Sequence, residues 1–585
     1  MLSTIIHRSL SPLSVCCVAF AVLGASIIQA AEFKPFLSLQ IAGPSTFISA
    51  AERVATIAGE PQLTQSIAMA APFKNLPGVN AAGTIGLAIQ ANEESAFGVE
   101  AIVSLPINNF LAFNIPGWEM YVMSLKMMAK PEGGKFIFAT PVGNFVGYQK
   151  QGFFLLATEG AAEFAATADH RTLFAEINEF SLGFHANLEN ITQETLATML
   201  NSIMMMLAAQ QGMGGPADPA AFSAFLDQAK EAIEEMSSVT WGITIDPRTL
   251  DITGSTKTVP KTGTALAEKH TKSKGALAKT PMGAFLPDTP NTVFAWHYLD
   301  YFTDREIDEM HKALELVGGN LIEGLHESME EEDADEARLE IFINAAEAFC
   351  HHLADGINFL ARERVLDSSY WLDSEGTFIL AIGTDKTDTV AKLNEKFHGK
   401  LLSILGTEAT TFIESRMKRN YETVAGFSLS CIPNVFADLP ADVSLPEEIR
   451  TVVQSIPLSL FWAVKNGEAL VYAVGLDFTQ TEQTLKSTLN RAQTPQPPPK
   501  QMGFVAAKPL ADFILNKILP LDPNPKPMDM AEARAVFAPF TAASPNLRYV
   551  ATEEYSDTAY TQKAQIPGEL VTAIIRIVVE GGRLQ

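Results

Sequence analysis

Alternating apolar and polar positions recur in pairs of short segments that are joined by tight turns. The clearest pair is 458–465 and 468–475, separated by Asn466-Gly467, a dipeptide typical of two-residue hairpin turns. After each pair, apolar residues recur every three or four positions, which predicts a helix. A more degenerate pair occupies 82–91 and 97–105. The clear hairpins are 145–150 with 153–158, 239–245 with 249–258, 369–372 with 377–383, 458–465 with 468–475, and 547–553 with 560–566.

A second recurring element is a single apolar segment that leads into a helix. Together the two elements predict an α+β fold of duplicated modules, in which a strand and helix are followed by a hairpin and helix. Because tight hairpins make antiparallel pairs, we expect antiparallel sheets with helices on one face. The strand and helix segments are 36–41 with 45–58, 173–180 with 192–207, 292–297 with 304–316, and 503–507 with 509–519.

Breaks in this pattern predict the domain boundaries. The segment 211–219 (QGMGGPADP) interrupts a helical pattern, and 494–499 (TPQPPP) has the composition of a stiff linker. The predicted organisation is a signal peptide at 1–30, α+β modules at 31–210, 220–325 and 326–493, the linker at 494–499, and a C-terminal α+β module at 500–585. The module 326–493 carries an acidic insertion.

The first thirty residues predict export. Arg8 precedes an apolar run of 14 residues at 15–28, and small residues follow at Ala30 and Ala31. The run is shorter than the ~20 residues that a membrane-spanning helix needs. We therefore expect cleavage near Ala30 and a periplasmic or extracellular protein that is not an integral membrane protein. Of the cysteines, Cys350 and Cys431 remain after cleavage, and the sequence leaves open whether they pair.

Charge excludes one class of partner. The 585 residues include 42 Lys and Arg against 67 Asp and Glu, which gives a net charge of −25. Nucleic-acid-binding proteins neutralise phosphates with clustered cations, so we expect no nucleic acid partner. An apolar content of 47% is that of a folded chain rather than a disordered one.

No strong catalytic signature is present. The sequence lacks a GxSxG elbow, a GxxxxGK[ST] phosphate loop, an HExxH zinc helix and an EF-hand loop. A hydrolase that uses two carboxylates remains an alternative, because such a pair has no characteristic spacing in the sequence. We expect no cofactor.

The best candidate site lies on a predicted helix at 339–360. Glu347, His351 and Asp355 fall at i, i+4 and i+8 on one face, with His352 beside them. Imidazole and carboxylate groups at this spacing suit a divalent metal or acid–base chemistry, and the alternative is a solvated helix face. The opposite, apolar stripe comprises Phe342, Ala345, Phe349, Leu353, Ile357 and Leu360.

Three compositional clusters have two interpretations each. The acidic run 327–340 suits Ca²⁺ or a solvated flexible loop, and the loop is favoured because a calcium loop needs a glycine that the run lacks. The lysine-rich strip 257–279 suits an acidic partner or an exposed strand and helix end. Methionine clusters suit copper, an apolar ligand groove or ordinary core, and the core or a pocket lining is favoured. The methionines are Met120, Met123, Met127 and Met128, and Met199, Met204, Met205, Met206 and Met213.

The segments 239–270 and 547–575, together with 1–30, resemble sequences in large exported bacterial proteins of unknown function that are built from strand-hairpin-helix modules. The resemblance implies export from a bacterium and a non-catalytic role. The leading hypothesis is an exported soluble binding or scaffolding protein of the cell envelope, with a protein or an apolar small molecule as partner. The alternatives are an envelope hydrolase that uses carboxylates and a carrier of an apolar ligand.

Overall fold

The chain divides into two compact units. The computed structural model describes residues 33–584 except for 93–98, 116–117, 141–142, 192–229, 231–232, 278–281, 288, 332–335, 405, 439–449, 451–453, 493–502 and 522–526. Unit 1 comprises Met1–Ala267 and Glu554–Ile575, and unit 2 comprises Glu268–Glu553 and Arg576–Gln585.

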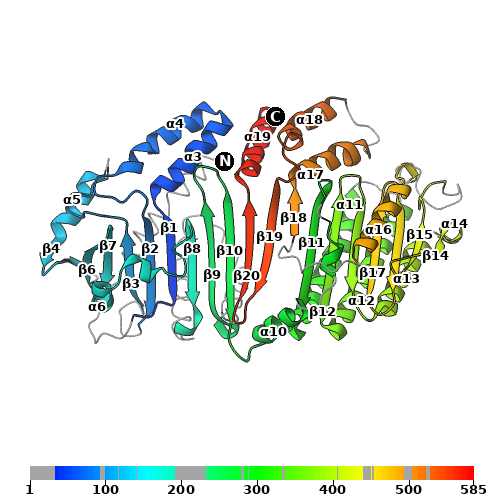
Figure 1. The fold of residues 1–585 in the computed structure, drawn as a ribbon, viewed down its shortest axis with the longest axis horizontal. Helices are drawn as coiled ribbons and strands as arrows, with labels where there is room; N and C mark the ends of the chain where they lie inside the picture. The colour runs from blue at the N-terminus through cyan, green and yellow to red at the C-terminus, as the bar shows by residue number, and fades with distance from the viewer. Residues whose placement is uncertain are drawn as a thin grey trace. The chain divides into compact units, whose positions relative to one another are not determined.

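Unit 1 is built on an antiparallel sheet in the order β4-β5-β6-β7-β3-β2-β1-β8-β9-β10-β20. Figure 1 shows β1 between β2 and β8, as the registers require. The last strand comes from the end of the chain, so residues far apart in sequence complete one sheet. The strands are β1 (Leu37–Ala42), β2 (Thr84–Ala91), β3 (Val99–Leu105), β4 (Ala129–Glu132), β5 (Lys135–Thr140), β6 (Gly143–Lys150), β7 (Phe153–Thr158), β8 (Leu182–Asn187), β9 (Met236–Ile245), β10 (Ile252–Pro260) and β20 (Tyr560–Ile566).

The helices of unit 1 begin and end at recognisable signals. Helix α3 starts at Pro44, where the missing N–H is not needed, and ends at Gly59, whose φ of 64° is readily adopted only by glycine. The helices are α3 (Pro44–Ala58), α4 (Pro61–Ala70), α5 (Glu119–Met128), α6 (Ala162–Thr167), α7 (His170–Leu173) and α19 (Gly568–Leu584), with short 3₁₀ turns at Ala71–Asn75, Glu159–Ala161 and Leu188–Asn190. Two helices cross the division between the units. Helix α19 continues beyond Ile575, the last residue of unit 1, and α10 (Ala265–Leu277) continues beyond Ala267.

The strand predicted at 173–180 is wrong, because these residues form turns that follow α7 and the strand β8 begins only at Leu182. The apolar residues here are spaced by three, and they pack over glycines of the sheet. A Cβ at Gly86 would lie 2.3 Å from the ring of Phe174, and one at Gly242 would lie 2.1 Å from the ring of Phe180. The absence of a side chain at these glycines therefore makes room for the aromatic core of unit 1.

Unit 2 contains a second antiparallel sheet in the order β14-β15-β16-β17-β13-β12-β11-β18-β19. Its largest core cluster includes Trp371, Phe461 and Phe504, which come from three different strands. The strands are β11 (Thr292–Tyr301), β12 (Val365–Asp373), β13 (Phe378–Gly383), β14 (Lys418–Val424), β15 (Phe427–Ile432), β16 (Ser459–Lys465), β17 (Ala469–Gly475), β18 (Gly503–Ala506) and β19 (Arg548–Tyr555).

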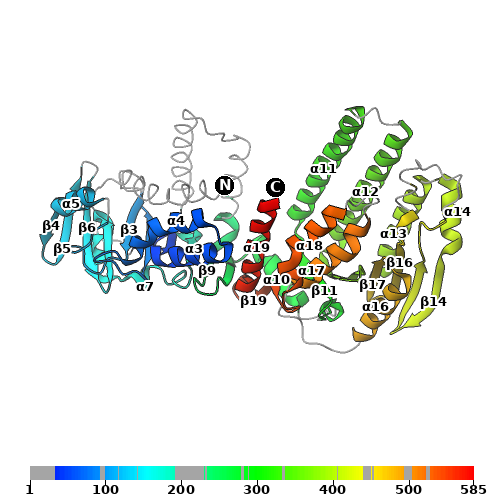
Figure 2. The same ribbon diagram turned by 90° about the horizontal axis from the view of Figure 1, so that it is seen from above.

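Two long helices dominate the helical part of unit 2. Figure 2 shows α11 (Asp304–Glu331) and α12 (Glu336–Glu363) side by side. The domain boundary predicted at 325–326 lies inside α11. The other helices described are α13 (Thr387–Ile404), α14 (Gly406–Arg416), α16 (Phe478–Arg491), α17 (Ala507–Phe513) and α18 (Pro527–Thr541). Short 3₁₀ turns lie at Met282–Phe285 and Leu519–Leu521, and a π-helical turn at Ile514–Ile518 continues α17.

The acidic run 327–340 is largely helical, which corrects the prediction of a flexible loop. Helix α11 continues to Glu331, and α12 begins at Glu336. Glutamate and alanine are good helix formers, so a run of carboxylates without glycine or proline permits helix even where like charges repel.

The mixed α+β class with antiparallel pairing is confirmed. The predicted hairpins β2–β3, β6–β7, β9–β10, β12–β13 and β16–β17 all pair, and the last predicted pair is present as β19 and β20. The signal peptide at 1–30, the helix at 192–207, the break at 211–219 and the linker at 494–499 lie outside the described residues, and they stay predictions.

Candidate functional site

The three residues of the predicted stripe all lie on α12, but they differ in their surroundings. Glu347 and His351 are exposed to solvent. Asp355 accepts a 2.6 Å hydrogen bond from Lys396 of α13. That hydrogen bond is the main reason why the pKa of Asp355 lies below its ordinary value. Asp355 is therefore held in an ion pair between helices, while its two partners in the stripe face water.

The stripe borders a shallow notch between α12 and α13, which opens to solvent. His352 stacks on Phe397 at this notch, with ring centroids 4.3 Å apart. Burial lowers the pKa of His352 below its ordinary value and favours the neutral ring. Within the described part of the chain, no group of three His, Cys, Asp or Glu side chains is placed to hold a metal ion. The notch is lined by Ala348, His351, His352, Asp355, Leu393, Lys396, Phe397 and Lys400.

The apolar stripe of α12 is buried only in part. Ile357 is buried, whereas Phe349 is 49% and Leu353 is 39% exposed. On α11, Leu316 and Val317 are also exposed. The helix pair thus keeps part of its apolar surface in solvent, which a periodicity argument from the sequence does not reveal.

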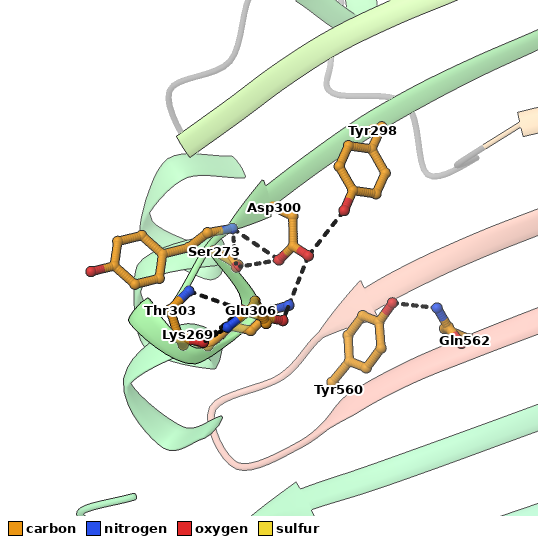
Figure 3. Close-up of polar contacts among 9 residues, drawn as sticks. Lys269, Ser273, Tyr298, Asp300, Thr303, Glu306, Tyr560 and Gln562 are labelled. Atoms are coloured by element: carbon orange, nitrogen blue, oxygen red, sulfur yellow. Dashed lines mark hydrogen bonds and ion pairs between the residues drawn. The ribbon is translucent and has the colours of Figure 1, made fainter. Parts of the chain in front are cut away.

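The lysine-rich strip contributes one side chain to a polar cluster in unit 2 (Figure 3). Lys269 of α10 lies 2.8 Å from Asp300 of β11 and 2.5 Å from Glu306 of α11. Thr303 and Glu306 form a capping box at the start of α11, because the amide of each residue donates to the side chain of the other. Tyr298 donates a 3.1 Å hydrogen bond to Asp300. A lysine, two carboxylates and a phenol therefore meet where three elements converge.

The electrostatics of this cluster describe a closed ion-pair network. Burial opposes the charge of Lys269, but hydrogen bonds from its ammonium group to Asp300 and Glu306 outweigh it and raise its pKa. Burial also disfavours the charged form of Glu306, but its contacts, chiefly the hydrogen bond from Lys269, together outweigh burial and lower the pKa of Glu306 below its ordinary value of 4.5. Burial and the neighbouring Asp300 raise the pKa of Tyr298. The single ammonium group of Lys269 contacts both carboxylates, so the cluster joins α10, β11 and α11.

Two buried histidines that the sequence analysis did not single out form hydrogen bonds with buried or partly buried side chains. His170 lies between the hydroxyls of Thr84 and Ser104, with N···O distances of 2.7 and 2.8 Å. Burial lowers the pKa of His170 to about 4. His297 contacts Asp367 at 2.9 Å, and both are buried. Ser104 has no solvent exposure, so this serine and histidine cannot meet an external substrate.

The outward side of α5 exposes several large apolar side chains. Val122 faces the core, whereas the neighbouring methionines face solvent, with Met120 81%, Met123 63% and Met127 74% exposed. The prediction that these methionines form core or line a pocket is therefore wrong. We define the α5 apolar face as Leu111, Trp118, Met120, Tyr121, Met123, Met127 and Met128, all of which are exposed.

Helix α5 is fixed to unit 1 from its other side. Val122 is 6% exposed, and Leu125 packs against the core cluster that contains Phe110, Phe138 and Phe154. The stacked rings of Phe110 and Phe154, with centroids 4.5 Å apart, give this cluster a rigid centre. The helix is thus held with its apolar face outward.

Other sequence candidates add no further site. Cys350 and Cys431 are both free thiols, on α12 and β15. The methionines Met199 to Met213 lie outside the described residues. None of the described helices is both long and apolar enough to span a membrane. Comparison of the chain with protein-family models, curated proteins and solved structures finds no match in any of the three.

Proposed function

We propose that the chain is an exported binding or scaffolding protein of the bacterial cell envelope, without chemistry of its own, and that it binds through the α5 apolar face. The observation that carries the proposal is the set of exposed large apolar side chains between Leu111 and Met128. Contiguous exposed apolar surface on a folded protein marks interaction sites, because burying it removes apolar area from water. Methionine suits such a surface, since its flexible thioether adapts to different partners.

The two units support a duplicated framework. When the strands of unit 1 are compared with those of unit 2, the order β4-β5-β6-β7-β3-β2-β1-β8-β9 corresponds to β14-β15-β16-β17-β13-β12-β11-β18-β19. We infer a duplication from this correspondence. In it, α5 takes the place of α13 and α14, between the third strand and the edge strand.

The corresponding helix of unit 2 has a different surface. The exposed residues described in α14 are polar: Thr407, Glu408, Thr411, Glu414 and Ser415. The framework therefore does not require apolar residues on the outside of this helix. Among the described residues, the exposed side chains of α14 include no counterpart of the α5 apolar face, which favours a role in binding over a role in folding.

The hydrolase alternative has less support. Its named residues Glu347 and His351 are exposed on α12, and Asp355 is engaged by Lys396. The carrier alternative predicts a cavity lined by methionines, and those of α5 lie on the surface. The other methionines, Met199 to Met213, lie outside the described residues, so the carrier stays an alternative.

Photo-crosslinking at α5 tests the proposal. The photoreactive residue benzoylphenylalanine replaces Met127 in the cells that produce the protein, and in a matched control it replaces Leu316, which is 66% exposed on α11. We expect adducts, identified by mass spectrometry, at position 127 and not at 316. Equal yields at both positions, or no adduct at 127, would overturn the proposal.

A further inference from the structure

We propose that the α5 apolar face binds the surface of a phospholipid membrane, with the helix lying along the interface rather than crossing it. This inference rests on the proposed function and names its partner.

The side chains of the face are those of an interfacial helix. Met120, Met123 and Met127 follow one another at i, i+3 and i+7 along the exposed side of α5. Trp118 and Tyr121 lie at its start with ring centroids 5.4 Å apart. Indole and phenol rings favour the boundary between water and acyl chains, because each combines an apolar body with a polar edge. A helix of ten residues is too short to span the bilayer, and it suits shallow insertion.

Polar groups beside the face already have partners. Ser124 donates a 2.8 Å hydrogen bond to the carbonyl of Met120 on the preceding turn. Lys126 donates a 2.8 Å hydrogen bond to the carbonyl of Leu111. Protein interfaces contain about one hydrogen bond per 100–200 Å², whereas a lipid acyl region requires none. Ser124 and Lys126 therefore use their polar groups within the protein, which matches this side of α5 better to lipid than to a protein partner.

Charge around the face points in the same direction. Residues 118–140 contain three lysines and two glutamates, so their net charge is 3 − 2 = +1 in a chain whose total is −25. Lys130 in β4 lies two residues beyond the end of α5, and Lys135 begins β5, opposite Glu132 at the turn of the hairpin. Lysines beside an apolar helix face complement the phosphates of lipid headgroups.

The adjoining edge of the sheet argues against a second copy as the occupant. Strand β4 is the edge strand next to α5, and it has only four residues, AKPE. Proline and exposed charged side chains prevent such an edge from pairing with another strand.

Flotation with vesicles tests the inference. The full chain is mixed with vesicles of phosphatidylethanolamine and phosphatidylglycerol, as wild type and as a variant carrying Met120→Gln, Met123→Gln and Met127→Gln. The matched control carries Leu316→Gln, Val317→Gln and Leu321→Gln on α11, which replaces as many exposed apolar side chains in unit 2. We expect the wild type and the control to float with the vesicles and the α5 variant to lose about tenfold or more in apparent partitioning.

The outcomes separate the possible occupants. A wild-type protein that does not float, or an α5 variant that floats as well as the wild type, overturns the lipid inference. A wild-type dimer in sedimentation velocity that the α5 variant loses would assign the face to a second copy and also overturn it. Protein adducts from position 127 without flotation would overturn the lipid inference and leave the proposed function standing. The single substitution Met127→Gln gives the same test, with a smaller loss, if the triple variant does not fold.

Discussion

The carboxylate of Asp251 accepts a 2.6 Å hydrogen bond from the amide of Gly568, 317 residues later in the chain. Asp251 precedes β10, and Gly568 is the first residue of α19. A carboxylate at this position satisfies a free amide of the helix and faces the positive end of its dipole. The contact accompanies the pairing of β20 with β10 and ties the end of the chain to unit 1.

Gly568 leaves no room for a side chain, so Gly568→Ala tests this contact. A Cβ there would lie 1.8 Å from the carbonyl oxygen of Thr249. We expect the free energy of unfolding, measured by urea, to fall by about 1–3 kcal/mol, as for other overpacked sites. Gly254→Ala on β10 is the control, because nothing lies within 4 Å of a Cβ at that position. Equal effects of the two substitutions would contradict the close approach.

His170 makes the stability of unit 1 depend on pH. Burial, partly opposed by Asp169, lowers its pKa from 6.5 to about 4. The neutral ring is therefore favoured in the folded state, so its contribution is complete above pH 6.5 and is lost progressively as the pH falls from 6.5 to about 4. We expect urea unfolding to show a loss on the order of 2 kcal/mol from this residue between pH 7 and pH 4. His170→Asn should be less stable at pH 7 and should lose less on acidification, and an unchanged pH dependence in this variant would refute the assignment.

Lys269 is expected to stabilise unit 2 because its ammonium group is shared by the carboxylates of Asp300 and Glu306. Its side chain is 21% exposed, so Lys269→Ala leaves two partly buried carboxylates facing each other. Thermal and urea unfolding at pH 7 should show a loss of about 1–3 kcal/mol. The loss should shrink as the pH falls below 4.5, because the pKa of Glu306 lies under that value. Lys272→Ala, on the exposed side of the same helix, should change little, and a similar loss there would contradict the network.

The ring of Phe180 occupies the space that a side chain at position 242 would need, and Gly242 leaves that space open. A methyl group at 242 would lie 2.1 Å from the Phe180 ring, so Gly242→Ala should lower the free energy of unfolding by about 1–3 kcal/mol. Phe180→Leu should recover part of that loss in the double variant, because the smaller side chain makes room for the methyl group. A double-mutant cycle in urea measures this coupling, and strictly additive losses would contradict direct contact.

The same pair shows where the sequence was informative and where it was not. Hairpins such as β16–β17 follow from alternation and the turn Asn466-Gly467, which are local signals. The turns around Phe180 resemble a strand in composition, and only their packing on Gly242 of a distant strand explains their conformation. The order of strands depends on pairings such as β10 with β20, which no local pattern encodes.

The candidate site shows a similar division. The methionines of α5 and the stripe of Glu347, His351 and Asp355 could be singled out by residue type and spacing. The exposure of these side chains could not be predicted from the sequence, because it depends on which side of each helix the rest of the fold covers. Met120 faces solvent because Val122 and Leu125 take the inward positions of α5. Asp355 forms an ion pair because α13 places Lys396 beside it.

Oxidation of methionines tests most directly whether the α5 apolar face is covered when the protein functions. Peroxide is applied to the purified protein and to the cell-envelope fraction that contains it, and oxidation is quantified by mass spectrometry. Met69 on α4, which is 71% exposed, is the internal reference for the 81% and 74% exposed Met120 and Met127. The account predicts that the three oxidise alike in the purified protein and that Met120 and Met127 alone are protected several-fold in the envelope fraction. Equal oxidation of all three in both samples would contradict it.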